Sequence, residues 1–134
     1  MVNNEIITPY FENEVFAGVR VTLGDEDFVI TPKDHHCGKV TQREAMKALK
    51  ADNLITWNYK QACFIIAYLI AHRDKINDIM ESNGGESING YYWTSTQSED
   101  SQIYIYEYNK FITFGCYNGS YLDCRVRPIK NLKK

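Results

Sequence analysis

Cysteine and histidine are the residues of this sequence that could act as nucleophiles, bases or metal ligands. Two of the three histidines and one of the four cysteines stand together in Asp34-His35-His36-Cys37. Imidazole and thiolate groups both suit zinc. Adjacent residues rarely converge on one ion, however, and no second pair follows at ligand spacing. We therefore expect a polar loop at residues 34–37, with no metal ligand and no cofactor.

A cysteine–histidine pair is the other chemistry that these residues offer. The candidates for thiolate and base are Cys37, Cys116, Cys124, His35, His36 and His72. Nothing in their spacing selects one combination. The sequence also lacks a glycine-rich phosphate loop and an H-E-x-x-H helix. We therefore expect no catalytic residue and a protein that is not an enzyme.

Tyrosine is unusually frequent in the second half of the chain. Seven of the ten tyrosines lie between Tyr91 and Tyr121. Tyrosine offers a large, stiff contact area at low entropic cost, while serine, asparagine and glycine add adaptable hydrogen bonds. This composition is typical of a contact surface, although aromatic residues also favour strands that pack internally. The candidate ligand-binding residues are Tyr104, Tyr106, Tyr117, Asn118, Tyr121, Asp123 and Arg125.

The composition describes one globular domain over residues 1–134. Hydrophobic residues make up 44% of the chain and charged residues 24%, which excludes a largely disordered protein. A net charge of −2 argues against nucleic acid held by bulk charge. The longest apolar run, at 62–71, is too short to span a bilayer, and we expect no membrane insertion. No secretory signal is visible, so we expect a cytoplasmic or phage-particle-associated protein with reduced thiols.

The N-terminal part of the sequence predicts a β-hairpin. Apolar residues alternate with polar ones from Val15 to Leu23, which is typical of a half-buried strand. The residues expected on its inner face are Val15, Ala17, Val19, Val21 and Leu23. Turn residues at 24–27 predict a loop of three to five residues, followed by a return strand that begins at Phe28.

Two helices are expected after the hairpin. Thr41-Gln42-Arg43-Glu44 is a capping-box sequence, and it predicts a helix that runs to about Lys50 with Ala45, Met46 and Leu49 facing inward. Residues 59–81 contain no glycine or proline and carry apolar residues at helical spacing. Asn83-Gly84-Gly85 tolerates a left-handed backbone and should end this second helix.

The C-terminal part carries strand patterns. Residues 104–108 predict a strand with three tyrosines on one face, and Asn118-Gly119 predicts the tight turn of a hairpin. If these two residues form the turn, the numbers of paired residues sum to 237. Cys116 and Cys124 then lie on opposite faces of the hairpin, so they cannot form a disulfide. Arg127, before a proline, is a candidate structural anchor. Strands and helices that are separated along the chain indicate an α+β protein.

Three segments together resemble a known family. They are His72-Arg73-Asp74-Lys75-Ile76-Asn77, Gly90-Tyr91-Tyr92-Trp93-Thr94-Ser95-Thr96 and Arg125-Val126-Arg127-Pro128-Ile129. Their order and spacing resemble bacterial C-type-lectin-like domains of the major-paralogous-domain group and the related diversified variable proteins of gut bacteria and prophages. The resemblance covers roughly residues 59–130.

The resemblance implies a C-type-lectin-like fold, with two helices packed on a small antiparallel sheet, an N-terminal hairpin and a β-rich C-terminal half. It also implies a non-enzymatic domain that binds a protein or glycan ligand. The Glu-Pro-Asn and Trp-Asn-Asp motifs of calcium-dependent lectins are absent, so we expect no calcium site of that kind. Two alternatives stay open: an assembly module of a phage tail or surface complex that forms a homo-oligomer, and a cysteine-dependent enzyme.

Overall fold

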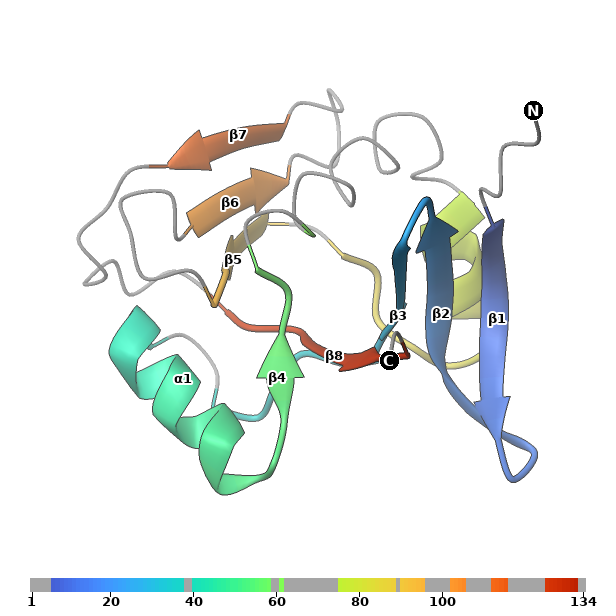
Figure 1. Cartoon of the computed structure of the whole chain (residues 1–134), viewed down its shortest axis with the longest axis horizontal. Helices are drawn as coiled ribbons and strands as arrows, with labels where there is room; N and C mark the ends of the chain where they lie inside the picture. The colour runs from blue at the N-terminus through green and yellow to red at the C-terminus, as the bar shows by residue number, and fades with distance from the viewer. Residues whose placement is uncertain are drawn as a thin grey trace.

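The computed structural model describes residues 6–37, 40–58, 61, 75–88, 90–95, 102–105, 112–115 and 125–132. Strands within these ranges form two antiparallel sheets (Figure 1), and helical segments accompany them, so the chain is α+β as expected. The five-stranded sheet has the order β1 (Ile6–Glu12), β2 (Val15–Leu23), β3 (Glu26–Ile30), β8 (Pro128–Asn131) and β4 (Ile55–Thr56). The three-stranded sheet consists of β5 (Gly90–Trp93), β6 (Gln102–Ile105) and β7 (Ile112–Gly115).

Strand β1 was not predicted from the sequence. It pairs with β2 through a two-residue turn in which Asn13 and Glu14 both adopt positive φ, at 52° and 66°. That turn geometry is ordinarily signalled by glycine at the second position, and Glu14 gives no such signal. Pro9 also lies within β1, where it is tolerated because β1 is an edge strand.

The predicted strand at 15–23 is confirmed as β2, but two details of the hairpin were wrong. Leu23 pairs with Glu26, so the loop to β3 has two residues instead of three to five. Ala17 is an extra residue opposite β1, because Tyr10 pairs with Gly18 and Phe11 with Phe16. This bulge reverses the alternation of faces. Phe16 therefore packs against the core, while Val15 is 66% exposed.

An ion pair joins β2 and β3 on the polar face of the hairpin. Arg20 donates from Nε and Nη2 to both carboxylate oxygens of Asp27, at 2.9 and 2.6 Å. The Arg20 guanidinium, together with the Thr22 hydroxyl, holds the pKa of Asp27 below its ordinary value. Because both side chains are partly exposed, we expect Asp27→Asn to lower the free energy of unfolding by no more than about 1 kcal/mol at pH 7.

The pH dependence of this effect follows from the lowered pKa of Asp27. The ionised carboxylate stabilises the folded state above the unfolded pKa of about 4, and this stabilisation is lost as the pH falls through the folded pKa. Urea unfolding should thus show a gap between the wild type and Asp27→Asn that closes in acid. Asp78→Asn, at an exposed position, serves as the control. A gap larger than about 1 kcal/mol at pH 7, or one that stays open in acid, would contradict this assignment.

The first helix is confirmed as α1 (Gln42–Ala51). The Thr41 hydroxyl accepts from the Glu44 amide, and the Glu44 carboxylate accepts from the Thr41 amide, which completes the predicted capping box. Ala45 and Leu49 are buried and Met46 is half-buried, as expected. They pack with Trp93 and Val126 in a small apolar cluster.

The end of the second predicted helix is confirmed. Residues 75–82 are helical, and Gly84 has a φ of +83°. The amide of Gly85 donates to the carbonyl of Met80 and that of Gly84 to Glu81, which is the pattern of a glycine-terminated helix. Gln61 is also helical, but the residues between 61 and 75 lie outside the described ranges.

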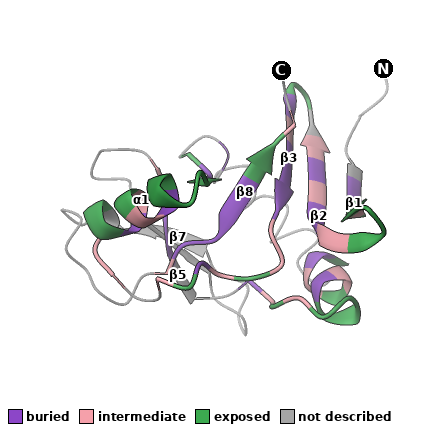
Figure 2. Cartoon of the chain, turned by 90° about the horizontal axis from the view of Figure 1, so that it is seen from below, coloured by how far each residue is buried: buried purple, intermediate pink, exposed green. Residues whose placement is uncertain are grey.

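The main core lies between helix 75–82 and the five-stranded sheet. Helix 75–82 lies behind β1 and β2 in Figure 1, and its Ile76 and Met80 are fully buried. They pack with apolar side chains of β1, β2 and β3, with Trp57, and with Tyr92 of β5. Figure 2 shows buried residues along β3 and β8, whereas most of α1 faces solvent. The core therefore joins the N-terminal strands to the start of the second sheet.

The C-terminal strands are antiparallel, as expected, within the described residues. The predicted strand at 104–108 overlaps β6, which covers 102–105, while 106–108 lie outside the described residues. The predicted turn at Asn118-Gly119, its register, and Cys116 and Cys124 lie outside them as well. The last strand, β8, does not join the three-stranded sheet. It lies between β3 and β4 in the five-stranded sheet.

Candidate functional site

The segment 31–37 is held in place by the chain around β8. Both the amide and the hydroxyl of Thr31 donate to the carbonyl of Pro128, at 3.1 and 2.7 Å. The amide of His35 donates to the carbonyl of Val126 at 2.8 Å. These bonds link residues more than 90 positions apart. They give the polar loop predicted at 34–37 a definite backbone position.

Asp34 forms a partly buried ion-pair network with two arginines. Its carboxylate accepts from Arg127 Nε at 2.8 Å and from Arg125 Nη1 at 2.7 Å. The Arg127 side chain is fully buried and also donates to the carbonyls of Thr31, Glu86 and Ser87. This confirms Arg127 as a structural anchor. It ties segment 31–37 to the C-terminal chain and to the loop after helix 75–82.

Arg125 connects this network to the three-stranded sheet. Its guanidinium carbon lies 5.0 Å from the ring centroid of Tyr92, and the two residues form a parallel bridge. Tyr92 is buried in the core, and burial raises the pKa of its phenol to about 12. Tyr92 therefore stays protonated at neutral pH and acts as a packing residue.

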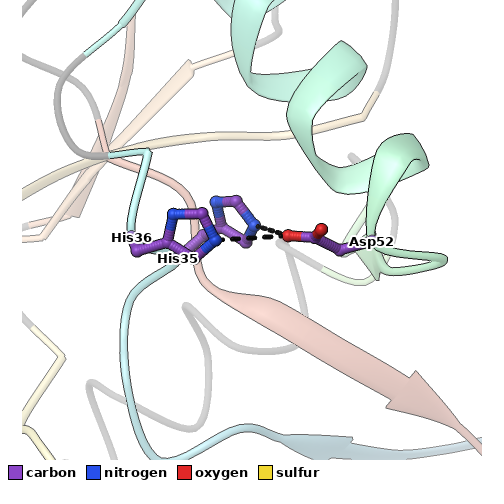
Figure 3. Close-up of side chains that lie close together, drawn as sticks. All are labelled: His35, His36 and Asp52. Carbon is purple, nitrogen blue, oxygen red and sulfur yellow. Dashed lines mark hydrogen bonds and ion pairs between the residues drawn. The ribbon is translucent and has the colours of Figure 1, made fainter.

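His35, His36 and Asp52 form a cluster at the C-terminal end of α1. His35 Nε2 lies 2.7 Å from Asp52 Oδ2, and His36 Nε2 lies 3.3 Å from the same oxygen. Figure 3 shows both imidazole rings turned toward the carboxylate. The rings stack with centroids 4.2 Å apart and an interplanar angle of 29°. The two adjacent histidines thus present equivalent nitrogen atoms to one point, although His35 is buried and His36 is 84% exposed.

Hydrogen bonding defines the tautomer of His35. Its Nδ1 accepts from the Cys37 amide at 3.1 Å, so the ring proton lies on Nε2 and is donated to Asp52. This hydrogen bond, with a smaller contribution from His36, lowers the pKa of the Asp52 carboxyl. Asp52 is therefore ionised throughout the neutral range.

Cys37 lies close to this cluster, but its environment opposes thiolate chemistry. The side chain is partly buried, and burial raises the pKa of its thiol. A nucleophilic cysteine needs the opposite shift, because the thiolate is the reactive form. A Cys37–histidine nucleophile therefore receives no support from the structure. Cys63, Cys116 and Cys124 lie outside the described residues.

A surface cavity of about 530 Å³ opens beside the cluster. His35, His36 and Asp52 line it, together with apolar groups of Phe16, Leu54 and Pro128. Cavities of this size hold small molecules in many proteins. The arrangement offers one carboxylate oxygen, two imidazole nitrogens and an apolar wall. Chemically, it can exchange protons, bind a cation or accept a small polar ligand.

Most of the ligand-binding residues predicted from the sequence lie outside the described residues. These are Tyr106, Tyr117, Asn118, Tyr121 and Asp123. The backbone of Tyr104 lies in β6, paired with Tyr91 on one side and Thr113 on the other. Arg125 is 31% exposed and engaged with Asp34 and Tyr92. The described ranges therefore place Tyr104 and Arg125 on two neighbouring residues of β5, Tyr91 and Tyr92.

Asp52 is the member of the cluster that the sequence did not reveal. It follows His35 by 17 positions and forms the C-cap of α1. No spacing rule connects a loop histidine to a helix end, because the contact depends on how α1 packs against β4 and the C-terminal chain. The only local signal was the capping box, which located the start of α1.

Comparison with protein-family models, with curated proteins and with solved structures found no match. Within the described residues, no helix combines the length and the apolar character needed to cross a membrane.

Proposed function

We propose that this protein is a non-enzymatic recognition domain with a C-type-lectin-like architecture. In this proposal it binds a protein or glycan through the three-stranded sheet and the tyrosine-rich segment that follows it. The register of that sheet is the observation that carries the proposal. Tyr91 pairs with Tyr104, and Tyr104 with Thr113, in one cross-strand row. The next row contains Tyr92, Ile103 and Phe114.

These two rows belong to opposite faces of the sheet, because consecutive residues of a strand alternate between faces. Tyr92 is fully buried in the core, so its row belongs to the inner face. The row of Tyr91, Tyr104 and Thr113 then belongs to the opposite face, which it shares with Trp93, a residue that is fully buried against α1. In this proposal the residue types of that row suit a contact surface, because tyrosine offers stiff aromatic area and both tyrosine and threonine offer hydroxyl groups.

Anchoring of the sheet supports the same proposal. Trp93 is fully buried, and its indole nitrogen donates to the carbonyl of Val40 at 2.8 Å. The Trp93 amide donates to the carbonyl of Arg125, next to the partly buried ion-pair network. A binding surface loses less entropy on association when its supporting strand is fixed in advance. β5 is such a strand.

The finer assignments from the sequence remain part of this proposal. They are the lectin-like fold, an origin in a prophage, and a location in the cytoplasm or on a phage particle. An assembly module that buries the tyrosines between copies is the competing proposal. It predicts a stable oligomer, whereas the recognition proposal predicts exposed tyrosines on the free protein.

Alanine substitutions test the recognition proposal. Tyr104→Ala and Tyr121→Ala should each weaken binding about thirtyfold or more, because loss of an aromatic contact at a hot spot costs 2 kcal/mol or more. Their melting temperatures should stay close to that of the wild type. The probe is a printed glycan array read with the labelled full-length chain, with affinities of positive glycans measured by titration. Tyr10→Ala, on the other sheet, is the matched control.

Two results would contradict the proposal. A large drop in melting temperature for Tyr104→Ala would assign that ring to the interior of the protein. A stable oligomer in sedimentation experiments, with its tyrosines protected from iodination, would favour the assembly module.

A further inference from the structure

We infer that His35, His36 and Asp52 form a binding site for a divalent transition-metal ion of the zinc type. The inference does not depend on the recognition function. Three donor atoms, two imidazole nitrogens and one carboxylate oxygen, lie within 4.8 Å of one another. Zinc and similar ions favour this combination of nitrogen and oxygen ligands.

The distance between His36 and Asp52 suits a tetrahedral ion, and the distance between His35 and Asp52 must increase. Ligand bonds of about 2.0–2.1 Å separate neighbouring ligand atoms by about 3.4 Å. His36 Nε2 and Asp52 Oδ2 are 3.3 Å apart, close to that separation. His35 Nε2 and Asp52 Oδ2 are 2.7 Å apart, because they share a proton, and must separate by roughly 0.7 Å to admit an ion. A small rotation of the exposed Asp52 side chain would provide this space.

The surroundings of the cluster favour a cation and leave it accessible. Asp52 is the C-cap of α1, and the C-terminal end of a helix carries a partial negative charge. His36 is largely exposed but is already ordered by stacking on buried His35, so little rotational freedom remains to be lost. All three residues line the cavity of about 530 Å³. Three protein ligands leave a fourth position for water or for a group of a molecule in the cavity.

Metal binding changes the position of one proton. In the present arrangement Nδ1 of His35 accepts from the Cys37 amide, and Nε2 carries the proton. When Nε2 binds the ion through its lone pair, the ring stays neutral only if the proton moves to Nδ1 by exchange with water. No proton is gained or lost overall, and the hydrogen bond from the Cys37 amide breaks. The ion thus replaces the proton shared by His35 and Asp52.

This exchange of tautomers gives a readout that a nonspecific surface contact would not produce. In nitrogen NMR spectra, addition of Zn²⁺ to the full-length chain should convert His35 from the Nε2-protonated to the Nδ1-protonated form. The amide signal of Cys37 should shift at the same time. With Co²⁺ as probe, the visible spectrum should indicate nitrogen and oxygen ligands, without the charge-transfer band of a cobalt–thiolate bond.

Variants assign the site. His36→Ala and Asp52→Asn should each weaken Zn²⁺ binding about tenfold or more, measured by competition with a chromophoric chelator. His36 is a suitable position because its exposed ring can be removed without opening the core. His72→Ala, which removes the remaining histidine of the chain, should bind as the wild type does.

Three results would overturn the inference. The first is no Zn²⁺ binding by the wild type at pH 7.5 and 100 μM metal, about the weakest affinity worth calling a site. The second is equal affinity in the wild type, His36→Ala and Asp52→Asn. The third is a cobalt–thiolate band that disappears when the cysteines are alkylated, which would place the metal on the thiols.

Discussion

Arg127→Met is expected to destabilise this protein more than any other single change of a charged residue described above. The substitution removes one of the two partners of the Asp34 carboxylate and leaves the carbonyls of Thr31, Glu86 and Ser87 without their donor. Removing one partner from a buried ion pair typically costs 3–5 kcal/mol. We expect the free energy of unfolding to fall by about 4 kcal/mol, a large fraction of the 5–15 kcal/mol available to a typical domain.

Urea unfolding followed by tryptophan fluorescence measures this effect, because Trp57 and Trp93 are both fully buried. Arg125→Met is the matched control: it removes the other partner of Asp34, but its guanidinium is 31% exposed. The loss for Arg125→Met should be about 1–2 kcal/mol. If Arg127→Met does not fold, Arg127→Lys keeps the charge without the forked geometry and should fall between the two. Equal losses for Arg127→Met and Arg125→Met would refute the anchoring role of Arg127.

Gly18→Ala is expected to disrupt the pairing of β2 with β3. Gly18 adopts a φ of +136°, and a Cβ atom built there would lie 2.1 Å from the carbonyl oxygen of Ile30 and 2.8 Å from a methyl carbon of Val29. Backbone strain of this kind costs about 1–3 kcal/mol, and forced overpacking a similar amount. The combined loss in the free energy of unfolding should therefore be about 3 kcal/mol or more.

Gly24→Ala separates the clash at Gly18 from the general cost of positive φ. Gly24 has a φ of +58°, with no atom within 4 Å of its built Cβ. Only the left-handed conformation then opposes alanine, at about 1–2 kcal/mol. Thermal unfolding by circular dichroism and hydrogen exchange of the β2 and β3 amides compare the two variants. If both lose the same stability, the close approach to Ile30 is not the cause.

The elements that the sequence predicted well are those defined by local interactions. The capping box of α1 needs only Thr41 and Glu44, three positions apart, and both hydrogen bonds form as expected. The end of helix 75–82 needs only the glycines that follow it. The alternation at 15–23 located β2, because one side of that strand faces the core. The position of Arg127 before Pro128 predicted a structural anchor, but the sequence did not predict which groups Arg127 would bind.

The errors arose where the pairing of two strands overrides the alternation within one of them. The bulge at Ala17 turned Val15 outward, since β1 pairs with β2 in a shifted register that the β2 sequence does not show. β1 itself was missed because its turn uses Glu14 in place of glycine. The tyrosine positions remain predictions, apart from the backbone place of Tyr104 in β6.

By itself, the sequence determined the α+β class, the start of α1, the end of helix 75–82 and the strand at 15–23. Turns, caps and alternation depend on residues that are only a few positions apart. Only the tertiary structure decided which charged groups meet. Asp34 reaches Arg125 and Arg127 across more than 90 positions, and His35 meets Asp52 because α1 ends beside segment 31–37. Such contacts depend on how whole elements pack, and no local pattern of side chains records that packing.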